Sequence, residues 1–329
     1  MGTFILRRTL GAIPLLLFVS IAVYGLLQLA PGGPTSMYLR RGAGMNGDDL
    51  AKLEESLGLN EPFYVQYWRW LGNVLQGDFG MAITSSRSVS AEILDRLPNT
   101  IYLMGSAWLL TLLLAIPIGI YSAMRQYTKF DHAVTAFTFI GQSIPTFWFG
   151  LLLILLFYMK LDNPFTGDPL LPSGGIRTIG EDLHGWAMVK DRILHLILPV
   201  TMLSLGWIAW YSRFLRATML EVIHLDYVRT ARAKGLNERV VILKHAFRNA
   251  AIPLVTLMAL DLPALFTGAL FAEVIFSWPG MGRLFFQAAE RRDYGLLMAI
   301  IMITSVLIIL SNLIADLIYA RLDPRIKYS

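Results

Sequence analysis

Long apolar stretches, separated by polar segments, set the pattern of this chain. Six stretches reach the roughly 20 residues that a helix needs to cross a hydrocarbon core of about 30 Å. They cover approximately residues 10–30, 101–124, 133–159, 194–211, 252–275 and 296–319. None alternates as a strand does, and a helix satisfies its own backbone groups where water is absent. The pattern predicts an all-α polytopic protein with six transmembrane helices.

The first stretch resembles a secretory signal peptide because Arg7 and Arg8 precede it. Its apolar run is longer than a typical signal core, however, and it leads into Pro31-Gly-Gly-Pro34 without a small-x-small cleavage site. We therefore expect residues 1–30 to remain as an N-terminal anchor helix.

Composition supports the membrane assignment. Apolar residues make up 55% of the chain and charged residues only 16%, with a mean hydropathy of +0.56, which excludes an ordinary soluble domain. Cysteine is absent, so disulfides and thiolate chemistry are excluded. The net charge of +5 does not indicate nucleic-acid binding, because much of the basic charge lies beside the apolar spans.

The basic residues predict the orientation. Their density is highest near residues 7–8, near 125–129, in the loop 213–250 and in the tail 321–329. The alternate segments are longer and contain balancing acidic residues. The positive-inside rule then places both termini in the cytoplasm.

The segment 31–99 is too long for a simple connector, so we expect a partly helical extracytoplasmic cap there. Its core candidates are Leu57, Leu59, Phe63, Tyr67, Trp68, Trp70 and Leu71. Residues 100–320 form the predicted membrane core. Trp207, Trp210, Tyr211 and Trp278 occupy positions typical of interfacial aromatic residues.

The loop 213–250 has a helical pattern of its own. Apolar residues recur at helical spacing at Met219, Val222, Ile223, Tyr227 and Ala231. Gly235 is expected to end this helix, and residues 238–247 begin a second one. Such an exposed elbow suits a groove on a partner protein, although the residues alone equally allow a solvated basic connector.

The segment Arg229-Thr-Ala231 followed by Gly235 resembles the Glu-Ala-Ala-x-x-x-Gly loop of ATP-binding-cassette importer permeases. In that family the loop docks into the ATPase subunit and transmits nucleotide-driven motion. Arg229 and Thr230 depart from the leading Glu and Ala, and the family's Ile-x-Leu-Pro ending is absent. By this resemblance the coupling residues are Asp226, Tyr227, Arg229, Thr230, Ala231, Lys234, Gly235 and Leu236.

The same departures are typical of the dipeptide, oligopeptide and nickel permeases, and further motifs resemble that subfamily nearly end to end. They include Leu29-Ala-Pro31-Gly, Leu57-Gly-Leu59, Gly77-Asp-Phe-Gly80, Ile144-Pro-Thr-Phe147, Leu171-Pro-Ser-Gly-Gly175, Asp226 to Leu236, Trp278-Pro-Gly-Met-Gly282 and Leu322-Asp-Pro-Arg325. The resemblance implies a type I importer transmembrane fold in a bacterial or archaeal inner membrane. It also implies di- or oligopeptides as the substrate, with nickel, glutathione, opines or oligosaccharides as alternatives.

The resemblance further implies the partners: a second homologous permease subunit, two ATPase subunits and an extracytoplasmic solute-binding protein. This chain has no Gly-x-x-x-x-Gly-Lys-Ser/Thr loop, so we expect ATP and Mg to be bound by the partner ATPases. We expect no cofactor or metal in this chain and no enzymatic activity. The rival hypothesis is a stand-alone secondary carrier, but the sequence shows neither an inverted repeat nor a chain of intramembrane acids.

Four residues near or within the spans are candidates for the pathway or its gate. Asp261 lies within the fifth span, where it would either meet a cationic group of the substrate or be protonated or paired with the partner permease. Glu273 and Trp278 fall in the region that the resemblance makes the outer gate, and capping is the alternative for Glu273. Pro145 is expected to kink the third span. Asp316 is expected to be interfacial or paired with another helix.

Overall fold

The computed structural model describes residues 2–29, 55, 61–82 and 85–322. In this part of the chain helices are joined by turns and loops, and the only β-structure is two isolated bridges. The helices are α1 (Gly2–Leu29), α4 (Phe63–Leu75), α5 (Val89–Met124), α6 (Lys129–Ser143), α7 (Thr146–Phe157), α8 (Trp186–Ile223), α9 (Asp226–Ala233), α10 (Glu238–Val240), the π-helix η1 (Val241–Phe247), α11 (Arg248–Leu260), α12 (Ala264–Thr267), α13 (Leu270–Ile275), α14 (Met281–Glu290) and α15 (Tyr294–Leu322).

The predicted membrane spans are present, with one bent far more than expected. Within the described residues, five helical segments are long and apolar enough to cross a membrane. The pair α6 and α7 makes a sixth crossing if it counts as one span, and this pair is bent by 104°. The bend lies at Pro145, which lacks an N–H group and forces Ile144 out of the helical region, to φ −79° and ψ 125°. The kink predicted at Pro145 is therefore confirmed as a break.

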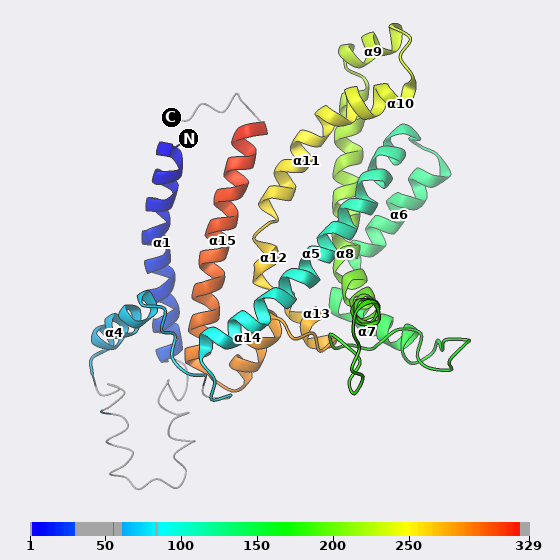
Figure 1. The fold of residues 1–329 in the computed structure, drawn as a ribbon. Helices are drawn as coiled ribbons and strands as arrows, with labels where there is room; N and C mark the ends of the chain where they lie inside the picture. Colours follow the sequence, from blue (N-terminus) through cyan, green and yellow to red (C-terminus); the bar gives the residue numbers. More distant parts are fainter. Residues whose placement is uncertain (1, 30–54, 56–60, 83–84, 323–329) are drawn as a thin grey trace.

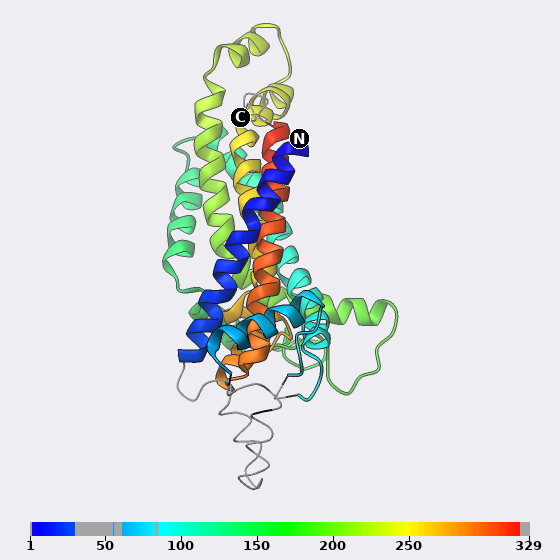
Figure 2. The same cartoon turned by 90° about the vertical axis from the view of Figure 1, so that its left-hand side faces the viewer.

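The helices define two ends of the molecule. The start of α1, the end of α15 and α9 lie at one end, which we call the elbow end, and α4 and α14 lie at the opposite end, the cap end (Figure 1). Helices α1 and α15 lie side by side along most of their length in both views (Figure 1, Figure 2). The beginning of α1 and the end of α15 therefore lie at the same end of the bundle as α9.

Helix α8 is the central element, because three other helices approach it closely through glycines. A Cβ atom at Gly119 of α5 would lie 2.9 Å from the Ser212 carbonyl oxygen, and one at Gly150 of α7 would lie 2.6 Å from Met202 Sδ. At Gly141 of α6 the nearest atom, Leu205 Cγ, would be 3.3 Å away. Small residues at such crossings let helix backbones approach closely where lipid offers no hydrophobic driving force.

The described part of the predicted cap is largely the helix α4, which packs on α1. Tyr67 is buried, and its hydroxyl lies 2.8 Å from Ser20 Oγ. Tyr24 of α1 makes edge contacts with the rings of Phe63 and Tyr67. Trp68, a predicted core residue, is instead 61% exposed, while Leu57 and Leu59 lie outside the described residues. The division at residues 30, 99 and 320 stays a prediction, although α5 runs straight through the second boundary.

Candidate coupling elbow and pathway residues

The eight predicted coupling residues lie together on one short arm at the elbow end. Helix α8 ends at Ile223, two residues turn the chain, and α9 runs over Asp226–Ala233. We call residues 224–238 the elbow. In both views α9 is the outermost helix at this end (Figure 1, Figure 2). All the predicted coupling residues except Ala231 are exposed: Asp226, Tyr227, Arg229, Thr230, Lys234, Gly235 and Leu236.

The base of the elbow is apolar and fixed to the bundle. Val228 and Ala231 are 0% and 5% exposed, and they share one buried cluster with Leu215 and Met219 of α8 and with residues of η1. The sequence pattern placed Tyr227 on one helical face with Ala231, but Tyr227 is 40% exposed whereas Ala231 is buried. The chain turns at His224–Leu225 between α8 and α9, and Val228 of α9 is the apolar residue buried beside Ala231.

Gly235 ends the first arm of the elbow, as predicted. Its φ of +73° is a left-handed conformation that a glycine adopts without the strain imposed by a Cβ atom. Apart from its two sequence neighbours, no atom of the described residues lies within 4 Å of the place where a Cβ would be. Backbone conformation, rather than crowding inside this subunit, is therefore what requires glycine here.

The second arm differs from the expected separate helix over residues 238–247. Asn237 caps its start, because its side-chain oxygen accepts a hydrogen bond from Arg239 N at 2.9 Å. The chain then passes through α10 and the π-helix η1 directly into α11, without a turn. Arg232 on the first arm pairs with Glu238 on the second at 2.9 Å. The elbow is thus joined to the fifth span as well as to α8.

At the cap end, Glu273 lies in a closed network. We call residues 273–283, together with Asn99 and Thr100 of α5, the Trp278 corner. Glu273 is 0% exposed, its Oε1 accepts from Thr100 Oγ1 at 2.9 Å, and its Oε2 accepts from Arg283 N at 2.9 Å. Arg283 is the third residue of α14, so the carboxylate caps the positive end of that helix. This geometry matches the capping alternative for Glu273, and a gating role stays a prediction.

Trp278 is held on the other side of the same corner. Its Nε1 donates to the Asn99 carbonyl oxygen at 2.9 Å, and Asn99 Nδ2 donates back to the Pro279 carbonyl oxygen at 2.9 Å. The indole is 1% exposed and packs with Leu103, Ala107 and Val200. Trp278 is thus buried inside the subunit with its N–H group paired, and its expected interfacial position stays a prediction.

Asp261 has a partner inside its own chain. It ends α11 and is half-buried, and Tyr211 of α8 donates its hydroxyl to Asp261 Oδ2. Tyr211 is 1% exposed, so it is buried in the subunit, and its expected interfacial position stays a prediction. Neither alternative stated for Asp261 included this bond. Asp316, by contrast, is paired with another helix as expected, since Arg8 Nε lies 3.2 Å from its Oδ2.

Sequence patterns missed the residues that complete these arrangements. Asn99 and Thr100 precede an apolar span, so their positions indicate only the polar edge of that span. The position of Tyr211 is typical of an interfacial aromatic residue. Their partners are 50 to 181 positions away in the chain. Pairings at that separation are set by helix packing, which no local pattern reports.

Taken together, the fold and the elbow define a polytopic helical membrane protein that presents one exposed polar arm on an apolar base. Two comparisons of sequence identify its family. The family described as "Binding-protein-dependent transport system inner membrane component" matches residues 115–328, and the N-terminal family of the same systems matches residues 1–104. The chain belongs to this family and is a permease subunit of an ATP-binding-cassette transporter.

Curated relatives match over the full length. The oligopeptide transport system permease protein AppB of Bacillus subtilis (strain 168) is 43% identical over 329 residues, covering 100% of both chains. The dipeptide permease DppB of Alkalihalophilus pseudofirmus is 36% identical over 337 residues, again covering 100% of both. The glutathione permease GsiC of Salmonella paratyphi A is 36% identical over 328 residues, with the same coverage.

The fold has a solved counterpart. A chain from inward-facing structures of the MetNI methionine ABC transporter matches with a TM-score of 0.53 at 15% identity. The match covers 70% of this chain and 96% of that one. The likeness confirms the predicted fold, that of a type I importer transmembrane domain.

Proposed function

We propose that this chain is one of two homologous permease subunits in an importer of di- or oligopeptides, driven by a separate ATPase that docks on the elbow. The observation that carries the proposal is the construction of the elbow, an exposed polar helix whose inward face is locked into the bundle core. A partner that grips such an arm moves α8 and α11 with it. A solvated connector needs no buried base of this kind.

The basic residues at the elbow end support an orientation of the chain in the membrane. Arg7 and Arg8 at the start of α1, and Arg125 and Lys129 beside α6, belong to the elbow end together with the basic residues of the elbow itself. This distribution supports a cytoplasmic elbow end with both termini inside. ATPase closure would then push the elbow inward and bias the bundle between two states, one of which opens the pathway outward.

The proposed substrate class rests on the relatives, whose names specify oligopeptides, dipeptides and glutathione. Nickel, opines and oligosaccharides remain the alternatives, and a solute-binding protein is expected to choose among them. Purification of the native complex, followed by identification of the captured binding protein and its solute, decides between these classes.

The elbow is tested by substitution at Gly235 in the reconstituted complete importer. Gly235→Trp adds bulk to the docking face and strains the turn, whereas Gly235→Asn retains much of the access to positive φ. We expect Gly235→Trp to assemble but to hydrolyse ATP without importing peptide, and Gly235→Asn to retain most coupling. Normal peptide import by the Trp variant would refute docking at this elbow.

Asp261 tests whether the pathway selects charge. If its carboxylate faces the pathway, Asp261→Asn lowers uptake of cationic peptides relative to neutral ones. Tyr211→Phe is the matched control, because it removes the same hydrogen bond and leaves the carboxylate in place. An equal change for both peptide classes in Asp261→Asn removes the pathway role and leaves Asp261 as a partner of Tyr211.

A further inference from the structure

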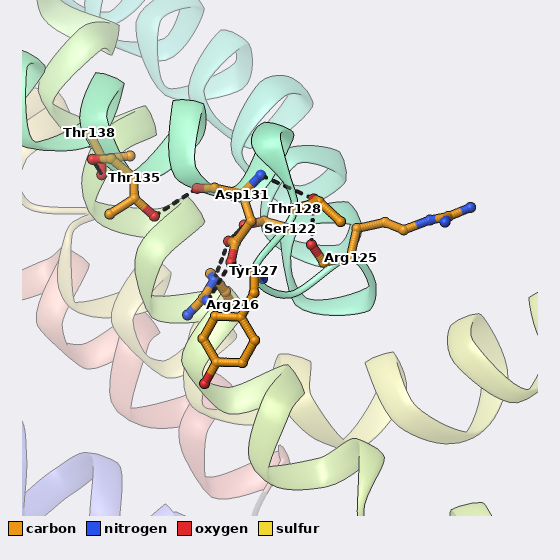
Figure 3. Close-up of polar contacts among 8 residues, drawn as sticks. All are labelled: Ser122, Arg125, Tyr127, Thr128, Asp131, Thr135, Thr138 and Arg216. Carbon is orange, nitrogen blue, oxygen red and sulfur yellow. Dashed lines mark hydrogen bonds and ion pairs between the residues drawn. The ribbon is translucent and has the colours of Figure 1, made fainter.

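A single carboxylate ties three helices together near the elbow end. Asp131, in the first turn of α6, is 2% exposed and receives hydrogen bonds from several directions (Figure 3). Arg216 of α8 donates from Nε at 2.6 Å and from Nη2 at 2.7 Å. Ser122 of α5 donates its hydroxyl, and Tyr127 in the α5–α6 turn donates its backbone N–H at 3.0 Å.

This arrangement is directional and shaped by the local chain. Two parallel bonds between guanidinium and carboxylate fix the relative orientation of the two groups as well as their distance. The turn that presents Asp131 includes Tyr127 at φ +62°, an uncommon conformation for a residue with a Cβ atom. Thr128 caps α6 just before Asp131. The carboxylate therefore fixes the parts of α5, α6 and α8 nearest the elbow end relative to one another.

The same part of α8 supports the elbow. Arg216 follows Leu215, which belongs to the buried cluster beneath Val228 and Ala231. Gly119 of α5 also approaches Leu215, whose Cβ would lie 3.0 Å from a Cβ placed on that glycine. Arg216 is therefore only one residue away from the apolar base of the elbow. A displacement of the elbow that moves Leu215 also moves Arg216.

Beyond the pair, α6 leads to the break at Ile144–Pro145, and α7 continues to a contact with α13, the helix that leads into the Trp278 corner. The other close approach of α6 to α8 is at Gly141 and Leu205, near the far end of α6. We propose that Asp131 and Arg216 are positioning residues for transport. The pair transmits a displacement of the elbow to the beginning of α6, and through α6 to the broken span. This inference rests on the proposed docking of the ATPase at the elbow.

Spin-label distances in the complete importer test this inference, and the absence of cysteine from this chain leaves no background labelling site in it. One label pair joins Arg239→Cys near the elbow to Leu10→Cys on α1, and the other joins Ala136→Cys on α6 to Leu10→Cys. All three positions are exposed. Distances are measured with and without a non-hydrolysable ATP analogue, and peptide import per ATP hydrolysed is measured without labels.

The decisive variant is the double substitution Asp131→Asn with Arg216→Gln, because it leaves no unpaired buried charge that would endanger folding. We expect the elbow distance to respond to the nucleotide analogue as before, the α6 distance to lose its response, and import per ATP to fall about fivefold. Asp95→Asn, which breaks the exposed pair with Arg87 at 2.8 Å, is the matched control and should change none of these quantities.

The two distances distinguish a failure of the Asp131–Arg216 pair from a failure of ATPase docking at the elbow. An α6 distance that responds in the double variant as in the unchanged importer, with import per ATP also unchanged, overturns the role of the pair while leaving elbow docking intact. An elbow distance that does not respond even in the unchanged importer refutes elbow docking, and the role of the pair falls with it.

Discussion

The elbow and the Trp278 corner are both polar segments that join helices, yet one exposes its side chains and the other buries them. At the elbow the polar groups point outward, and only apolar residues such as Val228 and Ala231 are buried. At the corner, Glu273, Thr100 and the Trp278 indole N–H all find partners within the subunit. The difference is what the proposed docking of a partner at the elbow requires, whereas the corner holds its own shape.

This contrast predicts where substitutions destabilise the protein and where they affect only transport. Changes at the corner should lower the stability of the folded subunit, because they leave buried polar groups unpaired or overfill a closed space. Changes at the elbow tip should leave stability nearly intact and act on coupling. Thermal stability of the purified complex, followed by size-exclusion chromatography after heating, measures the first quantity directly.

Gly280→Ala should have the largest effect. A Cβ at this position would lie 2.5 Å from Glu273 Oε2 and 2.5 Å from Thr100 Oγ1, inside the network itself. We expect a loss of about 3 kcal/mol or failure to assemble. Gly105→Ala on α5 is the matched control, because no described residue outside its own helix backbone lies within 4 Å of its Cβ position, and alanine favours a helix. Equal stability of the two variants would mean that the corner is not closed.

Thr100→Val should come next. It preserves the shape of the side chain but removes the hydroxyl that accepts from Met281 N at 2.7 Å and donates to Glu273. The unpaired buried amide should lower stability by about 1–3 kcal/mol. Thr111→Val on the same helix is the control, since that buried hydroxyl donates to the Ala107 carbonyl of its own helix. A smaller loss at Thr100 than at Thr111 contradicts the proposed role of the network.

Gly235→Ala should have a smaller effect on stability, of about 1 kcal/mol. The cost comes from the positive φ alone, because the surrounding space is open. The same thermal assay measures it, with Gly235→Asn as the control that tolerates this conformation better. A loss as large as that of Gly280→Ala would show that the elbow is packed as tightly as the corner.

Glu238→Gln should have the smallest effect. It breaks the ion pair with Arg232 across the elbow. The side chain of Arg232 is 38% exposed and that of Glu238 is 52% exposed. Exposed pairs of this kind contribute about 0.2–1 kcal/mol, and the contribution falls further at high salt. The complex should melt within a degree or two of the unchanged protein, on the usual scale of such changes. A large shift would indicate that the pair supports the elbow from within.

Much of the fold followed from the sequence because lipid imposes a simple rule on apolar stretches. The spans were predictable, but their ends were not: α8 covers Trp186–Ile223, well beyond the expected 194–211. Its extra turns lie outside the apolar stretch, and the helical spacing from Met219 onward gave no sign that this segment continues the fourth span. The break at Pro145 was predictable from the proline, whereas its angle of 104° depends on the packing of α7.

The candidate site shows the same division. The elbow residues were found because a short helix ending in glycine is a local pattern, and the resemblance gave it a role. The single helix expected from Met219 to Gly235 is instead interrupted by the two turn residues His224 and Leu225. The bonds from Tyr211 to Asp261 and from Arg216 to Asp131 join positions 50 and 85 residues apart. Taken alone, Tyr211 is typical of an interfacial aromatic residue and Arg216 of a cytoplasmic charge, so only the folded bundle shows the pairs.

The central claim is that this subunit imports solute only when an ATPase moves it. The most direct measurement is peptide accumulation in sealed proteoliposomes that contain the complete importer and its binding protein, with either an active ATPase or one unable to hydrolyse ATP. The account predicts accumulation only with the active ATPase. Accumulation by this chain without an ATPase, driven by an ion gradient alone, would contradict it.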